Sequence, residues 1–304
     1  MIEIFGIDSS PNDSGLLATK INARVVESLD ADDFGNECAC LCGCEPYQRV
    51  FANPGGDWFE NDITSFLFKR VAATDTITMQ LYKNDSLIGT LNGSTYGVYY
   101  DFGSLNDADC KGFKLEWEKV FNGLGYGVYH VKTTIVSLGD TIIKESLKYE
   151  CMEYSNARAE GTVRIETYQN GYIMNAFIDY TGMNWYQSYR IEGVFGYKKP
   201  TFETDNYQNS ARDITQIQDK ITDIYTLETK MLPSNLLNAI TYDGLLANNI
   251  LITDYNFCNY ERYKRLPVYP DSIEDFQTWE SNPHGTAIFK FTDKRQNKIK
   301  RNFY

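Results

Sequence analysis

Histidine is scarce in this chain, with 2 copies among 304 residues. A Ser-His-Asp or Cys-His catalytic site requires a histidine next to a nucleophile. His130 lies in a run of alternating residues and is expected at the surface or at an interface, while His284 lies in a predicted turn. Because neither histidine stands in a pattern with a nucleophile, the sequence argues against this class of enzyme.

Long apolar runs are missing as well. No stretch reaches the roughly 18 apolar residues that a membrane-spanning helix needs. The segment Met1–Asp8 lacks the basic start and the long apolar region of a secretory signal. We therefore expect a chain without a membrane segment, made and folded in a cytoplasm.

Seven cysteines are present, and four of them fall in one short run: Cys38, Cys40, Cys42 and Cys44. An odd, clustered set does not fit an extracellular disulfide framework. In an extended strand these cysteines would lie about 6.6 Å apart, whereas a zinc site needs its sulfurs about 2.3 Å from one ion. A turn at Gly43 would bring two or three together. Buried thiols, a weak metal site and disulfides all stay open, and no cofactor is predicted.

The formal net charge is −12, which disfavours general binding to nucleic acid. Basic residues nevertheless gather near the C-terminus, where Asp293 is the single acid among Lys290, Lys294, Arg295, Lys298, Lys300 and Arg301. This basic tail is either a solvated charged segment or a docking element for the acidic face of a neighbouring subunit. Contact with nucleic acid stays open only there.

The composition predicts a mainly β protein with filled cores, since 42% of residues are hydrophobic and 23 are tyrosine. Tyrosine suits both half-buried strand positions and interfaces. After an N-terminal strand region (1–60), short alternating segments at regular spacing predict an antiparallel sandwich-like domain over 61–155. Its strands are expected at 76–82, 87–91, 96–102, 114–117, 125–136 and 141–149, with one helical turn as the alternative for 114–117.

Residues 156–304 are expected to form a second β-rich domain with one or two short helices. The Asn170-Gly171 pair predicts a hairpin, Lys198–Asn206 a linker or long loop, and 233–248 a helix. Residues 212–231 fit a helical stripe of isoleucines or an extended ribbon rich in threonine, with the strand slightly favoured. Further strands are expected at 161–168, 172–180, 185–195, 250–253 and 287–291.

The segment from Arg212 to Tyr304 resembles tail and connector proteins of bacteriophages that infect Bacteroidota, including the crAss-like group. The resemblance rests on Tyr225–Pro233, Asn249–Asn256, Leu266–Pro270 and Phe289–Phe303. It covers about a third of the chain and includes no chemical motif. It implies a non-enzymatic virion building block, a ring, collar or tail-barrel subunit near the portal–tail junction. Its implied partners are identical subunits and adjacent portal, tail or ring proteins.

The resemblance and the basic tail together mark a set of interface residues: Tyr255, Asn256, Tyr260, Arg262, Tyr263, Arg265, Lys294, Arg295, Lys298, Lys300 and Arg301. Two alternatives stay open. The first is a receptor- or glycan-binding β module of the tail, with Trp58, Trp185 or Trp279 as stacking platforms. The second is a tail-associated hydrolase, which needs two carboxylates about 5–10 Å apart, and nothing in the sequence selects such a pair.

Overall fold

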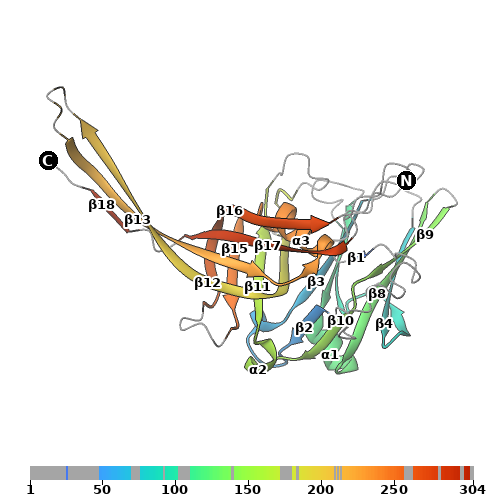
Figure 1. Ribbon diagram of the computed structural model, residues 1–304. Helices are drawn as coiled ribbons and strands as arrows, with labels where there is room; N and C mark the ends of the chain where they lie inside the picture. Colours follow the sequence, from blue (N-terminus) through green and yellow to red (C-terminus); the bar gives the residue numbers. More distant parts are fainter. Residues whose placement is uncertain are drawn as a thin grey trace.

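The computed structural model shows a mainly β protein, as predicted, with three sheets and a few short helices (Figure 1). It describes residues 25–26, 48–69, 76–91, 93–101, 110–137, 140–171, 180–182, 185–208, 210, 212, 214–256, 263–279, 282–294 and 298–301. Of the predicted strand at 172–180 only Tyr180 is described, and the four clustered cysteines lie outside the described residues.

The first sheet has seven strands: β1 (Val25–Val26), β2 (Gln48–Ala52), β4 (Thr76–Lys83), β5 (Ser86–Thr90), β8 (Gly127–Ser137), β9 (Asp140–Ser146) and β10 (Tyr149–Glu153). The strands expected at 76–82 and 87–91 are confirmed as the hairpin β4–β5, which turns at Asn84 and Asp85 with φ of 47° and 61°, the left-handed values that tight hairpins require. Strand β2 pairs in parallel with β10. Residues 48–52 therefore belong to this sheet.

A three-stranded sheet, consisting of β3 (Ile63–Lys69), β6 (Gly97–Asp101) and β7 (Cys110–Glu116), shares a hydrophobic core with the first sheet. A 3₁₀ turn, η1 (Trp58–Glu60), precedes β3. Strand β7 runs into helix α1 (Trp117–Leu124), which the sequence analysis did not predict. Trp117 is fully buried, and its indole N–H donates to the Thr64 hydroxyl at 2.9 Å.

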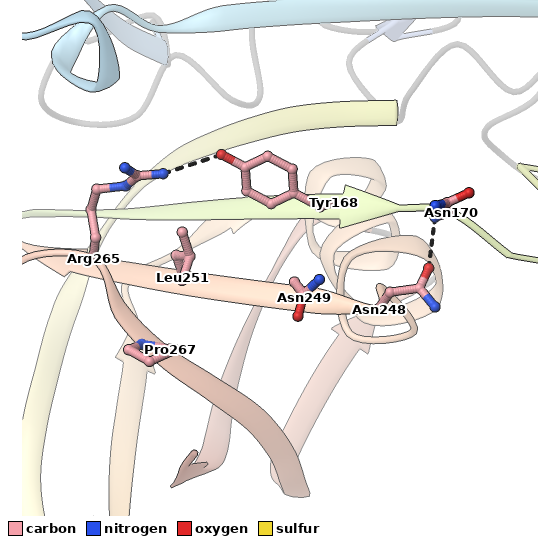
Figure 2. A pocket seen from close by; sticks show the side chains of 7 residues that line it. All are labelled: Tyr168, Asn170, Asn248, Asn249, Leu251, Arg265 and Pro267. Atoms are coloured by element: carbon pink, nitrogen blue, oxygen red, sulfur yellow. Dashed lines mark hydrogen bonds between the residues drawn. The ribbon is translucent and has the colours of Figure 1, made fainter. Parts of the chain in front are cut away.

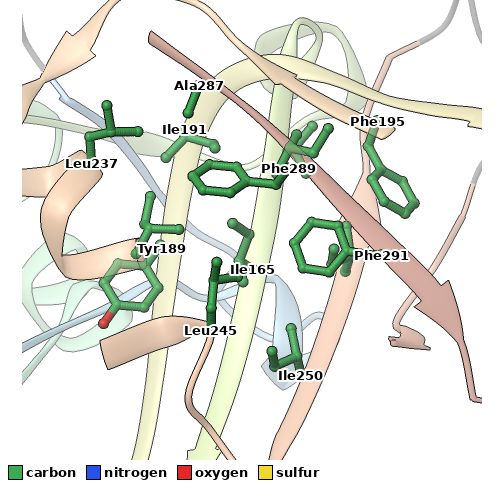
Figure 3. Close-up of a cluster of buried hydrophobic side chains, with 14 of the residues drawn as sticks. Ile165, Tyr189, Ile191, Phe195, Leu237, Leu245, Ile250, Ala287, Phe289 and Phe291 are labelled. Carbon is green, nitrogen blue, oxygen red and sulfur yellow. The ribbon is translucent and has the colours of Figure 1, made fainter. Parts of the chain in front are cut away.

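The second large sheet has eight strands: β11 (Thr162–Gln169), β12 (Trp185–Gln208), β13 (Ile214–Thr229), β14 (Leu232–Pro233), β15 (Asn249–Asp254), β16 (Leu266–Trp279), β17 (Asn282–Asp293) and β18 (Lys298–Arg301). The helices α2 (Asn156–Ala159) and α3 (Ser234–Ala239) are short, and α3 continues as a π-helical turn, η3 (Ile240–Gly244). Figure 3 shows side chains from the strands and the helical segment meeting in one core, among them Ile165, Tyr189, Phe289 and Leu237.

The second large sheet differs from the sequence-based predictions in several places. Residues 214–229 form a strand, so the helical alternative for 212–231 is wrong. A helix near 233–248 is confirmed, although it is shorter than expected. The predicted loop at Lys198–Asn206 is wrong, because these residues continue β12 and pair with β13. His284 lies in β17 and not in a turn. In the first sheet, His130 of β8 is 8% exposed and stacks on Tyr82 at 4.9 Å, so the predicted surface position is wrong as well.

Candidate functional site

One part of the fold extends far from the rest. Beyond the second core, β12 and β13 continue as a long two-stranded ribbon that projects from the body, with β18 along it (Figure 1). We call this projection the arm, and define it as Lys199–Gln208, Ile214–Ile224 and β18. Lys199 pairs with Ile224 at its base.

Large side chains on the arm and at its base are exposed to solvent. Phe202 is 63% exposed, Tyr207 58%, Ile214 68% and Tyr197, at the base, 85%. Phe202 stands opposite Ile221, which is 38% exposed, across the β12–β13 ladder. A narrow ribbon has no interior in which to bury such groups. Clustered exposed apolar side chains of this kind mark surfaces that bind other molecules.

The basic tail supplies the third strand of the arm. Residues Lys298–Arg301 pair antiparallel with Gln218–Ile221 of β13, so three predicted interface residues, Lys298, Lys300 and Arg301, lie on the arm. On the same edge of β13, β17 pairs with Ile224–Glu228. Within the described residues, no strand pairs with the outer edge of β12 beyond Gly193.

The base of the arm is fixed by aromatic rings. Phe195 and Tyr225 stack at 5.6 Å, and Tyr263 packs edge-on against both rings at 5.5 and 5.0 Å. Just beyond them the ladder shifts register between Gly196 and Lys199, where Tyr197 has a φ of 43°. Such a bulge bends a strand and increases its twist. Tyr263, which was predicted as an interface residue, therefore packs within the chain and stabilises the base of the arm.

A buried network of ions joins the start of β3, in the three-stranded sheet, to the second large sheet. The Asp62 carboxylate, just before β3, accepts from Arg164 Nε at 3.0 Å and from Arg190 Nε at 2.6 Å. It also accepts from the Phe51 N–H at 2.9 Å. Arg164 further donates to Glu166 at 2.9 Å and to the Tyr186 hydroxyl at 2.8 Å. All of these charged side chains are at most 3% exposed.

Electrostatics holds this network ionised. Burial alone would raise the pKa of Asp62, but Arg190, Arg164 and the Phe51 N–H together hold it below its ordinary value of 3.8. The guanidinium of Arg190 also lies over the rings of Phe51 and Tyr255, at 4.6 and 4.5 Å. Because every charge has a partner and each arginine has several acceptors, the network is a structural lock between the sheets.

A shallow depression lies on the second sheet where β11, β15 and β16 meet (Figure 2). Its volume is about 500 Å³, and it is lined by Tyr168, Asn170, Asn248, Asn249, Leu251, Arg265 and Pro267. Arg265 donates to the Tyr168 hydroxyl at 3.2 Å and to Glu166 at 3.1 Å. Side-chain amides and a guanidinium are groups that can orient a polar ligand.

The remaining predicted interface residues are scattered. Tyr255 and Asn256 are 7% and 8% exposed, and the Asn256 amide donates to the Gly193 carbonyl at 3.0 Å, so both side chains make contacts inside the chain. Lys294 lies beside the depression, with Nζ 3.3 Å from the Asn248 carbonyl. Tyr260, Arg262 and Arg295 lie outside the described residues.

The exposed apolar residues of the arm were not predicted from the sequence. Phe202 and Ile221 lay in segments read as a loop and as an ambiguous ribbon. The alternation of Thr201, Glu203 and Asp205 with Phe202 and Thr204 was a usable strand signal. The adjacent Lys-Lys-Pro concealed it, although proline is tolerated on an edge strand.

In the part of the chain that the structure describes, no three His, Cys, Asp or Glu side chains gather in a way that would hold a metal ion. Among the described helices, none is both long and apolar enough to cross a membrane. Compared with known proteins, the chain matches no protein-family model and no curated protein sequence.

Proposed function

We propose that this protein is a structural subunit of a bacteriophage virion, a ring, collar or tail-barrel component near the portal–tail junction. The arm is the observation that carries the proposal. The virion assignment itself rests on the sequence resemblance of residues 212–304. Its partners are identical subunits and the adjacent portal, tail or ring proteins.

The arm supports assembly for a physical reason. A ribbon of few strands without a core is marginally stable in water. The arm gains β18 only along Gln218–Ile221, and it exposes Phe202, Tyr207 and Ile214. Contact with a neighbour would bury these side chains and complete the free edge of β12. A heterologous contact, in which the arm meets a different surface of the next copy, forms a closed ring when the rotation between subunits closes.

The test compares the full chain with a variant that has a shortened arm. Since Lys199 and Ile224 face each other, an Asn-Gly turn can replace residues 200–223 and keep the root intact. Light scattering after size exclusion and negative-stain imaging report the assembly state. We expect the full chain to form rings and the shortened chain to stay monomeric. A full chain that is monomeric at every concentration and ignores portal and tail proteins would refute the proposal.

The depression favours a second candidate function, the binding of a glycan on a receptor. Amide groups of Asn170, Asn248 and Asn249 line it, and sugars are polar ligands that such groups can hydrogen-bond. Trp185 is 1% exposed and cannot stack on a sugar, whereas Trp58 is 58% exposed. A glycan array probes this function, with Asn248→Ala/Asn249→Ala as the control. Among the described residues no carboxylate lines the depression, so the hydrolase alternative gains no support from it.

A further inference from the structure

The arm of one copy requires a matching surface on the next, and β16 supplies the best candidate. We propose that the arm of one subunit docks on residues Asp271–Asp275 of a second copy of this chain. The inference rests on the proposed assembly function and names the two surfaces that meet. We call Asp271–Asp275 the acidic segment.

The acidic segment is exposed and partly unpaired. Strand β15 pairs with β16 only at Leu266–Val268, so beyond these residues β16 is paired with β17 alone among the described strands. Asp271, Glu274 and Asp275 are exposed acids, and Ile273 between them is 42% exposed. Lys290 forms an ion pair with Glu274, which leaves the segment with a net negative charge.

The arm has the complementary composition. Phe202 and Ile221 provide exposed apolar side chains, and β18 next to them reads Lys-Ile-Lys-Arg over its 4 residues. The ribbon itself carries Glu203, Asp205, Asp219 and Asp223 together with Lys199 and Lys220, so the excess positive charge of the arm is confined to β18. This basic strand beside an apolar centre is the part that we infer to meet the acidic segment. Opposite potentials of this kind fix the register of a contact and raise its association rate.

The position of the two surfaces makes the contact intermolecular. In Figure 1 the arm projects from one end of the second sheet, whereas β16 runs away from the arm toward the opposite end. The arm is directed away from the body and does not lie against its own β16. A head-to-tail contact between copies satisfies both surfaces at once, and each subunit keeps one free arm and one free acidic segment until a ring closes.

A charge-reversal experiment on the full-length chain tests the pairing. The first variant carries Lys298→Glu/Lys300→Glu, and the second carries Asp271→Lys/Ser272→Lys, which leaves the Glu274–Lys290 ion pair unchanged. Each variant alone should self-associate at least roughly tenfold more weakly, because like charges then face each other. Mixing the two should restore association, since the acidic arm of one then meets the basic segment of the other. The measurement is sedimentation velocity at low salt.

Controls separate the pairing from general charge effects. Lys119→Glu/Lys230→Glu makes the same charge change on the body, where both lysines are at least 40% exposed, and should associate like the unmodified chain. Raising the salt to about 1 M, where charges are screened beyond about 3 Å, should weaken the unmodified assembly and narrow the difference between the variants. Circular dichroism checks that each variant is folded.

The outcomes distinguish the two proposals. If the unmodified chain assembles but both reversed variants assemble equally well, or mixing does not restore association, the docking pair is wrong while the assembly function stands. If the unmodified chain does not assemble with itself or with portal and tail proteins, the assembly function fails and this inference fails with it.

Discussion

Two regions of the molecule place charged and aromatic groups in opposite settings: the buried junction at Asp62, where the start of β3 meets the second large sheet, and the arm. At the junction, Asp62, Arg164 and Arg190 are buried, and each has a charged or polar partner within the chain. On the arm, aromatic and aliphatic side chains such as Phe202 stand in solvent. The junction has completed its contacts within one chain, whereas the arm has not. Structural and assembly roles can thus be told apart by where charged and aromatic groups find their partners.

Removing the carboxylate at the junction should give the largest effect. Asp62→Ala leaves the guanidinium groups of Arg164 and Arg190 buried without their shared anion. Loss of one partner from a buried ion pair costs about 3–5 kcal/mol. We expect the free energy of unfolding to fall by that amount in denaturant titrations at neutral pH.

The control for this variant is Asp57→Ala. Asp57 is 59% exposed and lies 3.4 Å from Lys264, and an exposed ion pair contributes about 0–1 kcal/mol. Equal losses from the two variants would contradict a special role of the buried network. If Asp62→Ala does not fold, Asp62→Asn should fold with an intermediate stability.

The pH dependence of the free energy of unfolding tests the junction at Lys114. The ammonium of this residue lies 4.1 Å from the ring centre of Trp185. Burial lowers the pKa of Lys114 from 10.5 to about 8. Between these values the unfolded chain binds the proton and the folded chain releases it, so stability rises with pH. From pH 8 to 9.5 this group should add about 1–2 kcal/mol to the free energy of unfolding.

Lys114→Met removes the titrating group and should abolish that rise. Denaturant midpoints at several pH values, measured for both proteins, give the difference directly. Tyrosines of the unfolded chain, with a pKa near 10, begin to ionise in the upper part of this range, and the comparison with Lys114→Met subtracts their contribution. A rise of the same size in Lys114→Met would assign it to other groups.

Shortening the arm should affect stability far less than either change at the junction. Replacing residues 200–223 by an Asn-Gly turn retains the ring cluster of Phe195, Tyr225 and Tyr263. Elements with few buried contacts open independently of the core, so the free energy of unfolding should change by less than about 1 kcal/mol. Thermal unfolding measures this, and a cooperative loss of the whole fold would show that the arm supports the body.

The smallest effect on stability is expected from Phe202→Ala. This side chain is 63% exposed, and its truncation should change the free energy of unfolding by less than about 0.5 kcal/mol while weakening self-association. Phe195 lies in the same strand but is fully buried, so the matched variant Phe195→Ala should cost about 3–5 kcal/mol. Equal stability losses would show that Phe202 packs within its own chain.

Local patterns in the sequence were sufficient to predict the β4–β5 hairpin but not the buried ion network at Asp62. The turn at Asn84-Asp85 and the strand character of 214–229 follow from residues close in sequence. Helix α1 was missed, although Trp117, Val120, Phe121 and Leu124 follow a helical spacing, because β-rich neighbours suggested a strand. Asp62 lies 102 residues before Arg164 and 128 before Arg190. No local pattern connects residues so far apart.

That separation also has a consequence in time. Chains are synthesised at about 5–20 residues per second, so the Asp62 carboxylate is made between roughly 5 and 25 seconds before its arginine partners. During this interval Asp62, just before β3, lacks the two arginines that neutralise it in the folded chain. The first half of the protein therefore cannot reach its final state by itself. A nascent chain stalled before Arg164 would be a target for chaperones and proteases, which makes the lock between the sheets a checkpoint on complete synthesis.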